Sequence, residues 1–276
     1  MRGERQAPRA GAYITIVLIC RRLSRKDADA VPSKREKEQL LIDQNRPLMD
    51  ACSEVAHDLY LAERAKAIYL WVADHAEAVN KASFGKFFRL LQDFALTEMF
   101  LCVGRAFDDA RFGDTVCIKR VLNMMANANL IDRDRFLQFL PKEWESLAQL
   151  EDKALLQHGL QIISTSRPTA KNCAELKRVL EIRHTRVAHR SATSAGEGGA
   201  TFEDVDHCLD WAKEFIGMVG KAFGNHIFKY DDGTFWSEYD IKSSVMSIRR
   251  LTHKAGIVID PGFAETERLM AAFSKA

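Results

Sequence analysis

The sequence predicts an all-α fold, an antiparallel bundle of helices with short connections, and three observations support this prediction. The 276 residues include only 15 Gly and 6 Pro, which are too few for a turn-rich β protein. Apolar residues recur at helical spacing, and no segment alternates apolar and polar residues for long enough to predict a strand. Hydrophobic residues make up 47% of the chain, which is enough for a buried core and excludes wholesale disorder.

Four segments carry the clearest helical patterns and are expected to form a four-helix core. They comprise residues 50–80, 83–109, 169–190 and 202–223. Ser83 is a candidate N-cap of the second segment, and Pro168 precedes the third. Thr201 and Asp204 have the spacing of a capping box before the fourth segment. These start signals, together with the apolar periodicity, predict the helices in order along the chain.

The remaining segments are expected to add shorter helices around this core. They are a helix opening at Asp114, a helical arm over 131–158 broken at Pro141, a flexible linker over 191–200, a turn or hairpin tip at Asp232-Gly233, a helix over 237–254 and a short last helix after Pro261. We divide the chain into a disordered basic extension (1–32), a helical bundle (33–226) and a C-terminal helical extension (227–276).

The N-terminal stretch over residues 1–37 is rich in positive charge, with ten basic and four acidic residues. Its apolar run, residues 13–20, is eight residues long, whereas a bilayer-spanning helix needs roughly 20. Arg21 and Arg22 follow the run directly, and no small-residue cleavage site is present. We therefore expect neither a signal peptide nor a membrane anchor here.

Composition excludes several classes of protein. The six cysteines form no CxxC pair, and the chain has no HExxH motif, no P-loop and no GxGxxG motif, so we expect no metal and no cofactor. Reduced core cysteines in a cytoplasmic protein are the expected state. The formal net charge is only +2, which neither requires nor excludes a nucleic acid partner.

One octapeptide, Arg183-His184-Thr185-Arg186-Val187-Ala188-His189-Arg190, carries most of the functional information. The apolar stripe of its helix includes Leu176 and Val187, and Arg183 falls about 20° from the first and about 40° from the second. Arg183 therefore occupies a position where the pattern requires an apolar residue. A cation there costs free energy unless it is paired or faces a polar cleft, and such an inconsistency often marks a site.

His189 and the remaining arginines complete a basic face at the end of this helix. In a regular helix His189 points about 120° away from Arg183, so the two converge only if the helix loosens or if two copies meet. Arg186 and Arg190 lie beside Arg183 and suit phosphate oxygens. The alternative is that Arg186, His189 and Arg190 simply complement the helix macrodipole.

These residues resemble the signature of the HEPN superfamily: an Arg, a polar residue, and a His preceded by a small residue. The form seen here, with Ala188 before His189 and a charged residue after it, is similar to the AbiU-like branch, linked to abortive infection. The segment 103–109, which includes Arg105, Asp108 and Asp109, resembles a second landmark of that branch. The family usually has Asn or Asp directly after the Arg, where this chain has His184. The resemblance covers roughly residues 50–225.

The resemblance implies a four-helix HEPN-like bundle that dimerises and cuts RNA without a metal, as a toxin or phage-defence effector. It implies that Arg183, His184 and His189 are catalytic, that Arg186 and Arg190 bind substrate, and that Arg105, Asp108 and Asp109 support the site. A histidine can exchange protons with ribose oxygens near neutral pH, and an arginine can hold the phosphate. The expected partners are RNA, a second copy of the chain and an antitoxin protein, with no membrane.

Two other functions remain open at the level of sequence. Some HEPN-like domains bind nucleotides, RNA or a partner protein without cleaving anything, and a purely structural helical scaffold is the third possibility. The complete pair of Arg183 and His189 favours the nuclease. We also expect Asp108 or Asp109 to approach Arg183 or His189, because a cation in a helix seam needs a counter-charge.

Overall fold

The computed structural model describes residues 33–109, 116–128, 130–140, 147, 149–188, 199–258 and 262, with backbone alone for 186–188. All regular structure in these residues is helical and no strand is present, so the all-α prediction is confirmed. The basic extension over 1–32 and most of the linker over 191–200 lie outside the described residues. The chain contains two compact units, Met1–Leu40 and Leu41–Ala276. The three predicted domains, with boundaries at 32/33 and 226/227, stay a prediction.

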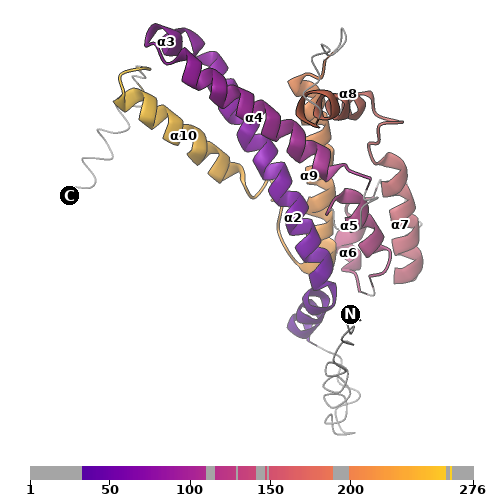
Figure 1. Cartoon of the computed structure of the whole chain (residues 1–276). Helices are drawn as coiled ribbons and strands as arrows, with labels where there is room; N and C mark the ends of the chain where they lie inside the picture. The colour runs from indigo at the N-terminus through magenta and orange to yellow at the C-terminus, as the bar shows by residue number, and fades with distance from the viewer. Residues whose placement is uncertain are drawn as a thin grey trace, which may run out of the picture. The chain divides into compact units, whose positions relative to one another are not determined.

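Nine α-helices and one π-helical segment make up the described structure (Figure 1). They are α2 (Lys34–Asp74), α3 (Ala76–Lys81), α4 (Gly85–Ala106), α5 (Ile118–Met125), α6 (Arg133–Leu137), α7 (Asp152–Ser166), α8 (Ala174–Ile182), η2 (Arg183–Ala188), α9 (Phe202–Gly224) and α10 (Glu238–Lys254). None of these helices is both long and apolar enough to cross a membrane.

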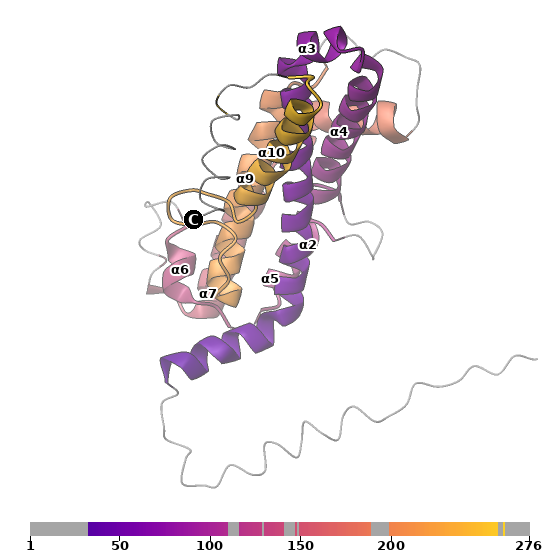
Figure 2. The same ribbon diagram turned by 90° about the vertical axis from the view of Figure 1, so that its left-hand side faces the viewer.

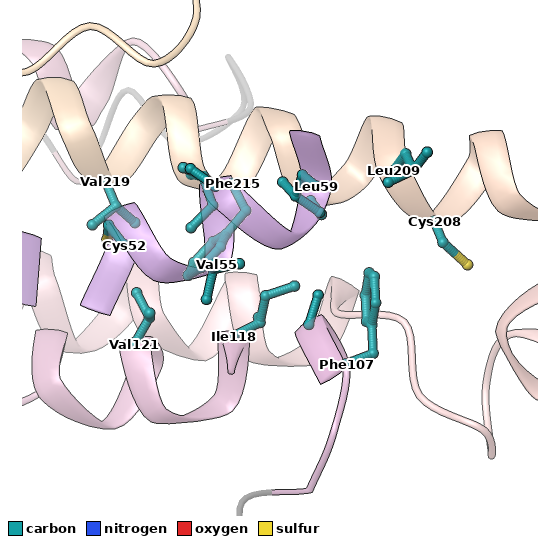
Figure 3. Close-up of a cluster of buried hydrophobic side chains, with 14 of the residues drawn as sticks. Cys52, Val55, Leu59, Phe107, Ile118, Val121, Cys208, Leu209, Phe215 and Val219 are labelled. Atoms are coloured by element: carbon teal, nitrogen blue, oxygen red, sulfur yellow. The ribbon is translucent and has the colours of Figure 1, made fainter. Parts of the chain in front are cut away.

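The main core of the second unit is built by more helices than the four predicted. Figure 3 shows Val55 and Leu59 of α2 facing Phe215 of α9, with Ile118 of α5 beside them. All four predicted segments contribute, and α5, α6 and α7 add further buried side chains such as Phe136. The ring of Phe136 occupies the space where Gly159 of α7 would carry a Cβ, 2.5 Å away. The short helices are therefore part of the core rather than additions to it.

Helices α2 and α4 form an antiparallel pair joined by the short α3 (Figures 1 and 2). The predicted first segment, 50–80, is two helices, because α2 ends at Asp74 and α3 begins at Ala76. Ser83 does not cap α4: it has a φ of 67°, and Phe84 is the N-cap with no side-chain hydrogen bond. The turn between α3 and α4 therefore depends on backbone hydrogen bonds, from Ser83 N to Asn80 O and from Phe84 N to Val79 O.

The third predicted segment begins later than the pattern suggested. Asn172 accepts a hydrogen bond from the Thr169 amide at 2.7 Å and donates one to the Arg167 carbonyl at 3.0 Å, which closes a turn over these residues. Helix α8 then begins at Ala174, with Cys173 as its N-cap. The polar turn satisfies the backbone groups that a helix over 169–173 would have used.

Helix α9 matches its prediction at both ends. The Thr201 side chain accepts the Asp204 amide, and the Asp204 carboxylate accepts the Thr201 amide, so the capping box is present. At the other end Asn225 adopts the left-handed conformation expected of a helix terminator, with a φ of 49°. Buried Asn45 of α2 donates to the carbonyl of Phe223 at 2.9 Å and to that of Leu130 at 3.0 Å, which fixes the end of α9 against α2.

The C-terminal region packs on a second, smaller apolar cluster. The turn at Asp232-Gly233 is present, with a bridge between Lys229 and Phe235, and α10 runs over Glu238–Lys254 as predicted. Val245 and Ile248 of α10 pack against the buried cluster of Trp71, Val72, Val79 and Phe88 at the junction of α2, α3 and α4. This cluster secures the end of the α2–α4 pair that lies away from Asp108.

A pair of leucines on α2 tests the position of the core. Leu59 is fully buried, whereas Leu70 on the same helix is 36% exposed. We expect Leu59→Ala to lower the free energy of unfolding by about 2–5 kcal/mol, the range for a buried leucine that leaves a cavity. Leu70→Ala serves as the matched control and should cost less than about 1 kcal/mol. Urea denaturation of both variants measures the difference, and equal losses would contradict this description of the core.

Candidate functional site

Helix α8 and the segment η2 that continues it carry the described part of the motif, and we call them together the site helix. Arg183 lies where this helix changes from α to π geometry. Helix α8 ends at Ile182, and η2 continues over Arg183–Ala188. The Thr185 hydroxyl donates to the Glu181 carbonyl at 2.8 Å, across this change of geometry. Because π-helical turns are rare and often occur at functional sites, the change at Arg183 supports the assignment of the motif.

The stem of Arg183 lies directly across Gly104 of α4. A Cβ at position 104 would stand 2.2 Å from Arg183 Cδ and 2.9 Å from its Nε. Nη1 of Arg183 also donates to the Gly104 carbonyl, at 3.2 Å. A long cationic side chain can therefore fill an apolar position of the seam, because the facing helix offers a glycine and a carbonyl there.

Asp108, just beyond the end of α4, supplies the counter-charge. Its Oδ2 lies 3.2 Å from Nη2 of Arg183, and the two side chains are 40% and 29% exposed. The expected approach of an aspartate to Arg183 is therefore confirmed. The pair is only partly desolvated, so its contribution to stability is small, about 1 kcal/mol or less. Its main effect is to hold the guanidinium at the mouth of the seam.

Arg183 also lines a hollow of about 820 Å³. The hollow is lined by Phe107, Asp108, Asp109, Lys119, Arg167, Thr169, Ala170, Lys171, Leu180, Arg183 and His184. Four of these side chains are cationic and two are carboxylates, so positive charge is in excess. His184 is exposed and belongs to the wall, next to Arg183. The volume falls in the range of small-molecule sites.

Asp109 faces two of the cations rather than Arg183. Its Oδ1 lies 3.6 Å from Lys119 Nζ and 3.9 Å from Arg167 Nη2. Its backbone amide donates to Asp108 Oδ1 at 2.9 Å, so the two aspartates form one acidic corner. The sequence predicted that Asp108 or Asp109 would approach Arg183 or His189. Asp108 contacts Arg183, whereas Asp109 lies near Lys119 and Arg167.

Arg167 is the most enclosed cation of the hollow. Its side chain is only 12% exposed, and its Nη1 is buried without a hydrogen-bond partner among the described atoms. A buried donor without an acceptor costs about 1–3 kcal/mol, and more when it is charged. Arg167 also lines the hollow, so its positive charge attracts an anionic ligand there.

Arg105 lies in a different place from the one the motif implies. Its Nη2 stands 2.7 Å from Oδ1 of Asp58 on α2, and its Nε lies 3.1 Å from the same oxygen. The Asp58 hydrogen bond is the largest cause of a raised pKa for Arg105. Together with His57, these residues line a separate hollow. Arg105 thus ties α4 to α2 and supports the site through the position of α4 alone.

Helix α8 is anchored to α9 by an ion pair between Arg178, which is partly exposed, and the buried Asp204. Nε of Arg178 donates to Oδ2 of Asp204 at 2.9 Å, and the Asp204 side chain is 6% exposed. The hydrogen bond from Arg178 is the main reason that the pKa of Asp204 is lowered. Because Asp204 also caps α9, one carboxylate fixes α8 and α9 together.

One group of residues in the described chain has donor atoms close enough to hold a metal ion. Cys173, Glu175 and His207 place theirs within 4.8 Å of one another, at the start of α8. No metal motif in the sequence indicated this group, because His207 belongs to α9. Burial is the main cause of a raised pKa for the Cys173 thiol. The group lines no part of the Arg183 hollow.

The described cysteines are all free and buried, as the sequence predicted for a reduced core. They are Cys52, Cys102, Cys117, Cys173 and Cys208. Burial raises the pKa of Cys208 to about 12 and also raises the pKa of Cys52. Cys52 and Cys208 therefore lack the thiolate character of a catalytic cysteine at neutral pH.

Part of the predicted site lies outside the described residues. His189 and Arg190 are not described, and only the backbone of Arg186 is. The structure thus brings together Arg183, His184, Asp108 and Asp109, separates Arg105 from them, and leaves the catalytic roles as predictions.

Gly104 and three cations belong to the site although sequence reasoning missed them. Lys119, Arg167 and Lys171 come from α5, the end of α7 and the turn before α8, and no local pattern links them. Gly104 could have been singled out from the sequence. A glycine inside an apolar helix costs about 1 kcal/mol relative to alanine, which indicates that close packing requires it.

The contact of Gly104 with Arg183 can be tested through the ion pair that it positions. We expect a double-mutant cycle of Arg183→Met and Asp108→Asn to give a coupling energy of about 0.5–1 kcal/mol, as for a partly exposed pair. In the Gly104→Ala background the coupling should vanish, because the new methyl group must displace the arginine stem. Urea denaturation measures all the variants. An unchanged coupling would show that Gly104 does not position Arg183.

Comparison with known proteins agrees with this geometry. No curated protein and no solved structure matches the chain. Residues 48–235 match the family HEPN_AbiU2, described as AbiU2, and this stretch includes the helices that form the Arg183 site. This family match supports a function of the HEPN type that is related to abortive infection. The all-α bundle and the matched stretch together place the chain in the AbiU2 family of the HEPN superfamily.

Proposed function

We propose that the chain is a metal-independent endoribonuclease of the HEPN type that acts as a toxin or an abortive-infection effector. The observation that carries this proposal is Arg183, whose guanidinium is held by Asp108 at the edge of a basic hollow. It is also the first residue of the motif that resembles the HEPN signature. RNA is the substrate because only RNA has the 2′-hydroxyl that this chemistry uses as its nucleophile.

In the proposed reaction His189 removes the proton from a ribose 2′-hydroxyl. The 2′-oxygen attacks the adjacent phosphorus, the bond from phosphorus to the 5′-oxygen breaks, and that oxygen leaves with a proton. The products are a 2′,3′-cyclic phosphate and a 5′-hydroxyl. Arg183 donates two N–H groups to the phosphate and stabilises the charge that develops on it. His184, in the wall of the hollow, is the second candidate for proton transfer.

The proposed active form is a homodimer. The resemblance to the HEPN superfamily implies this dimer, in which two copies bring their motifs together in one basic cleft. Arg186 and Arg190 add affinity for the RNA backbone. An antitoxin protein would hold such an enzyme inactive in the cell.

The first functional test concerns proton transfer. We expect His189→Ala to lower the rate of RNA cleavage at saturating substrate by about 10²–10⁴, the usual range for a general acid or base. Cleavage by the wild-type chain should persist in EDTA, leave a 2′,3′-cyclic phosphate and fail on DNA. Gel assays with end-labelled RNA measure rate and product, and growth after overexpression measures toxicity.

A second histidine provides the control for this test. His158 is exposed on α7 and does not line the hollow, so His158→Ala should leave the rate unchanged. Equal cleavage by the His189→Ala variant would show that the site is assigned wrongly. A chain that binds RNA but cuts none of several RNA pools would be a non-catalytic HEPN-like binding module.

The arginines of the basic face should act on binding rather than on chemistry. We expect Arg190→Gln to weaken RNA binding and to lower the slope of log affinity against log salt by about 0.7, the value for one phosphate contact on a single strand. The rate at saturating RNA should change little. Fluorescence anisotropy over a series of KCl concentrations measures the slope, and a large loss of rate at saturation would move Arg190 into the catalytic step.

A further inference from the structure

The hollow beside Arg183 holds more positive charge than one phosphate at Arg183 requires. Lys119, Arg167 and Lys171 line it, and none of them belongs to the motif over 183–190. They come from three separate places, namely α5, the residue that ends α7 and the turn before α8. The packing of the fold therefore gathers these cations, and a solvated surface alone does not explain why they share one concave wall.

Asp109 neutralises two of these cations without saturating their donors. The distances from its Oδ1, 3.6 Å to Lys119 Nζ and 3.9 Å to Arg167 Nη2, exceed the 2.7–3.2 Å of ordinary hydrogen bonds. The Asp109 side chain is 52% exposed, so the carboxylate lies at the open side of the hollow. A phosphate of an RNA strand carries the same single negative charge, so it can replace the carboxylate and keep the charge balanced.

The enclosed guanidinium of Arg167 points to the same conclusion. Its Nη1 is buried and has no acceptor among the described atoms, while its Nη2 faces only the distant Asp109 oxygen. Because Arg167 lines the hollow, the accessible part of its guanidinium can donate to an anion there, and phosphate oxygens suit such a donor. Lys119 and Lys171 would add the point charges that attract it.

We propose that Lys119, Arg167 and Lys171 form a second phosphate site, which binds the phosphate next to the one held by Arg183. This inference rests on the proposed function and names its substrate more closely: a single RNA strand with at least two consecutive phosphates in the hollow. Asp109 occupies the second site in the absence of RNA and yields it to the phosphate. The volume of about 820 Å³ suits nucleotides of one strand.

The test uses the full chain and a labelled 2′-O-methyl RNA of mixed sequence, which cannot be cleaved because its 2′-oxygen is blocked. Lys119→Met should weaken binding about tenfold and lower the salt slope by about 0.7. Arg167→Lys keeps the charge but loses the fork, so it should weaken binding with little change of slope. Asp109→Asn should do the opposite of Lys119→Met, with binding about threefold tighter, because the competing carboxylate is gone.

A lysine outside the hollow gives the matched control. Lys177 on α8 pairs with Glu181, and its side chain is 62% exposed, so Lys177→Met removes the same charge elsewhere. Its binding and salt slope should equal those of the wild type. Circular dichroism checks that every variant is folded, and the gain expected for Asp109→Asn is an effect that damage to the fold cannot produce.

Failure of the second site and failure of the nuclease give different results. If Lys119→Met behaves like Lys177→Met, or if Asp109→Asn weakens binding, the second site is wrong even where unmodified RNA is cut. If these variants respond as expected but unmodified RNA stays intact, the result supports the second phosphate site and contradicts the proposed cleavage mechanism. A wild-type chain that binds none of the RNA would overturn the second phosphate site.

Discussion

The geometry of the site depends on one constraint, a cation placed in the seam between α4 and the site helix. Burying part of a guanidinium costs free energy unless its donors are satisfied. Three features of α4 and the residues after it meet that cost: the space at Gly104, the Gly104 carbonyl at 3.2 Å and the Asp108 carboxylate at 3.2 Å. These contacts hold both the aliphatic stem and the guanidinium of Arg183, and the side chain lines the hollow. The register of α4 against η2 is set by the same contact.

The site helix is attached to α9 through α8, and its geometry changes at Arg183. At its start, Arg178 and the buried Asp204 tie α8 to the cap of α9, so the helix begins from a rigid point. At Arg183 the helix changes to π geometry. A π segment shifts the side chains that follow it relative to a regular helix. The angle of about 120° expected between Arg183 and His189 in a regular α-helix therefore does not apply, because the π segment begins at Arg183 itself.

The fold was more predictable from the sequence than the site. Local signals identified α9, because Thr201, Asp204 and Asn225 act on neighbouring residues and need no knowledge of tertiary contacts. The same reasoning failed at Thr169, where the Asn172 side chain competes with helix formation, and at Ser83, whose backbone is left-handed. For the site, the mismatch of Arg183 with its apolar stripe was visible and its pairing with an aspartate followed. Lys119 and Arg167 could not be found, because only packing brings α5 and the end of α7 to Asp109.

This arrangement couples the hollow to the stability of the fold. Asp108 and Asp109 follow α4, Lys119 belongs to α5, and Arg167 ends α7, so the charges meet only when these helices pack on the common core. An anion that binds there binds the folded chain and not the unfolded one, and it must stabilise the fold by mass action. Asp108 accepts a hydrogen bond from Arg183, whereas Asp109 lies 3.6 Å from Lys119 and 3.9 Å from Arg167. In the complex that we propose, the phosphate replaces Asp109 alone, and Asp108 continues to hold Arg183.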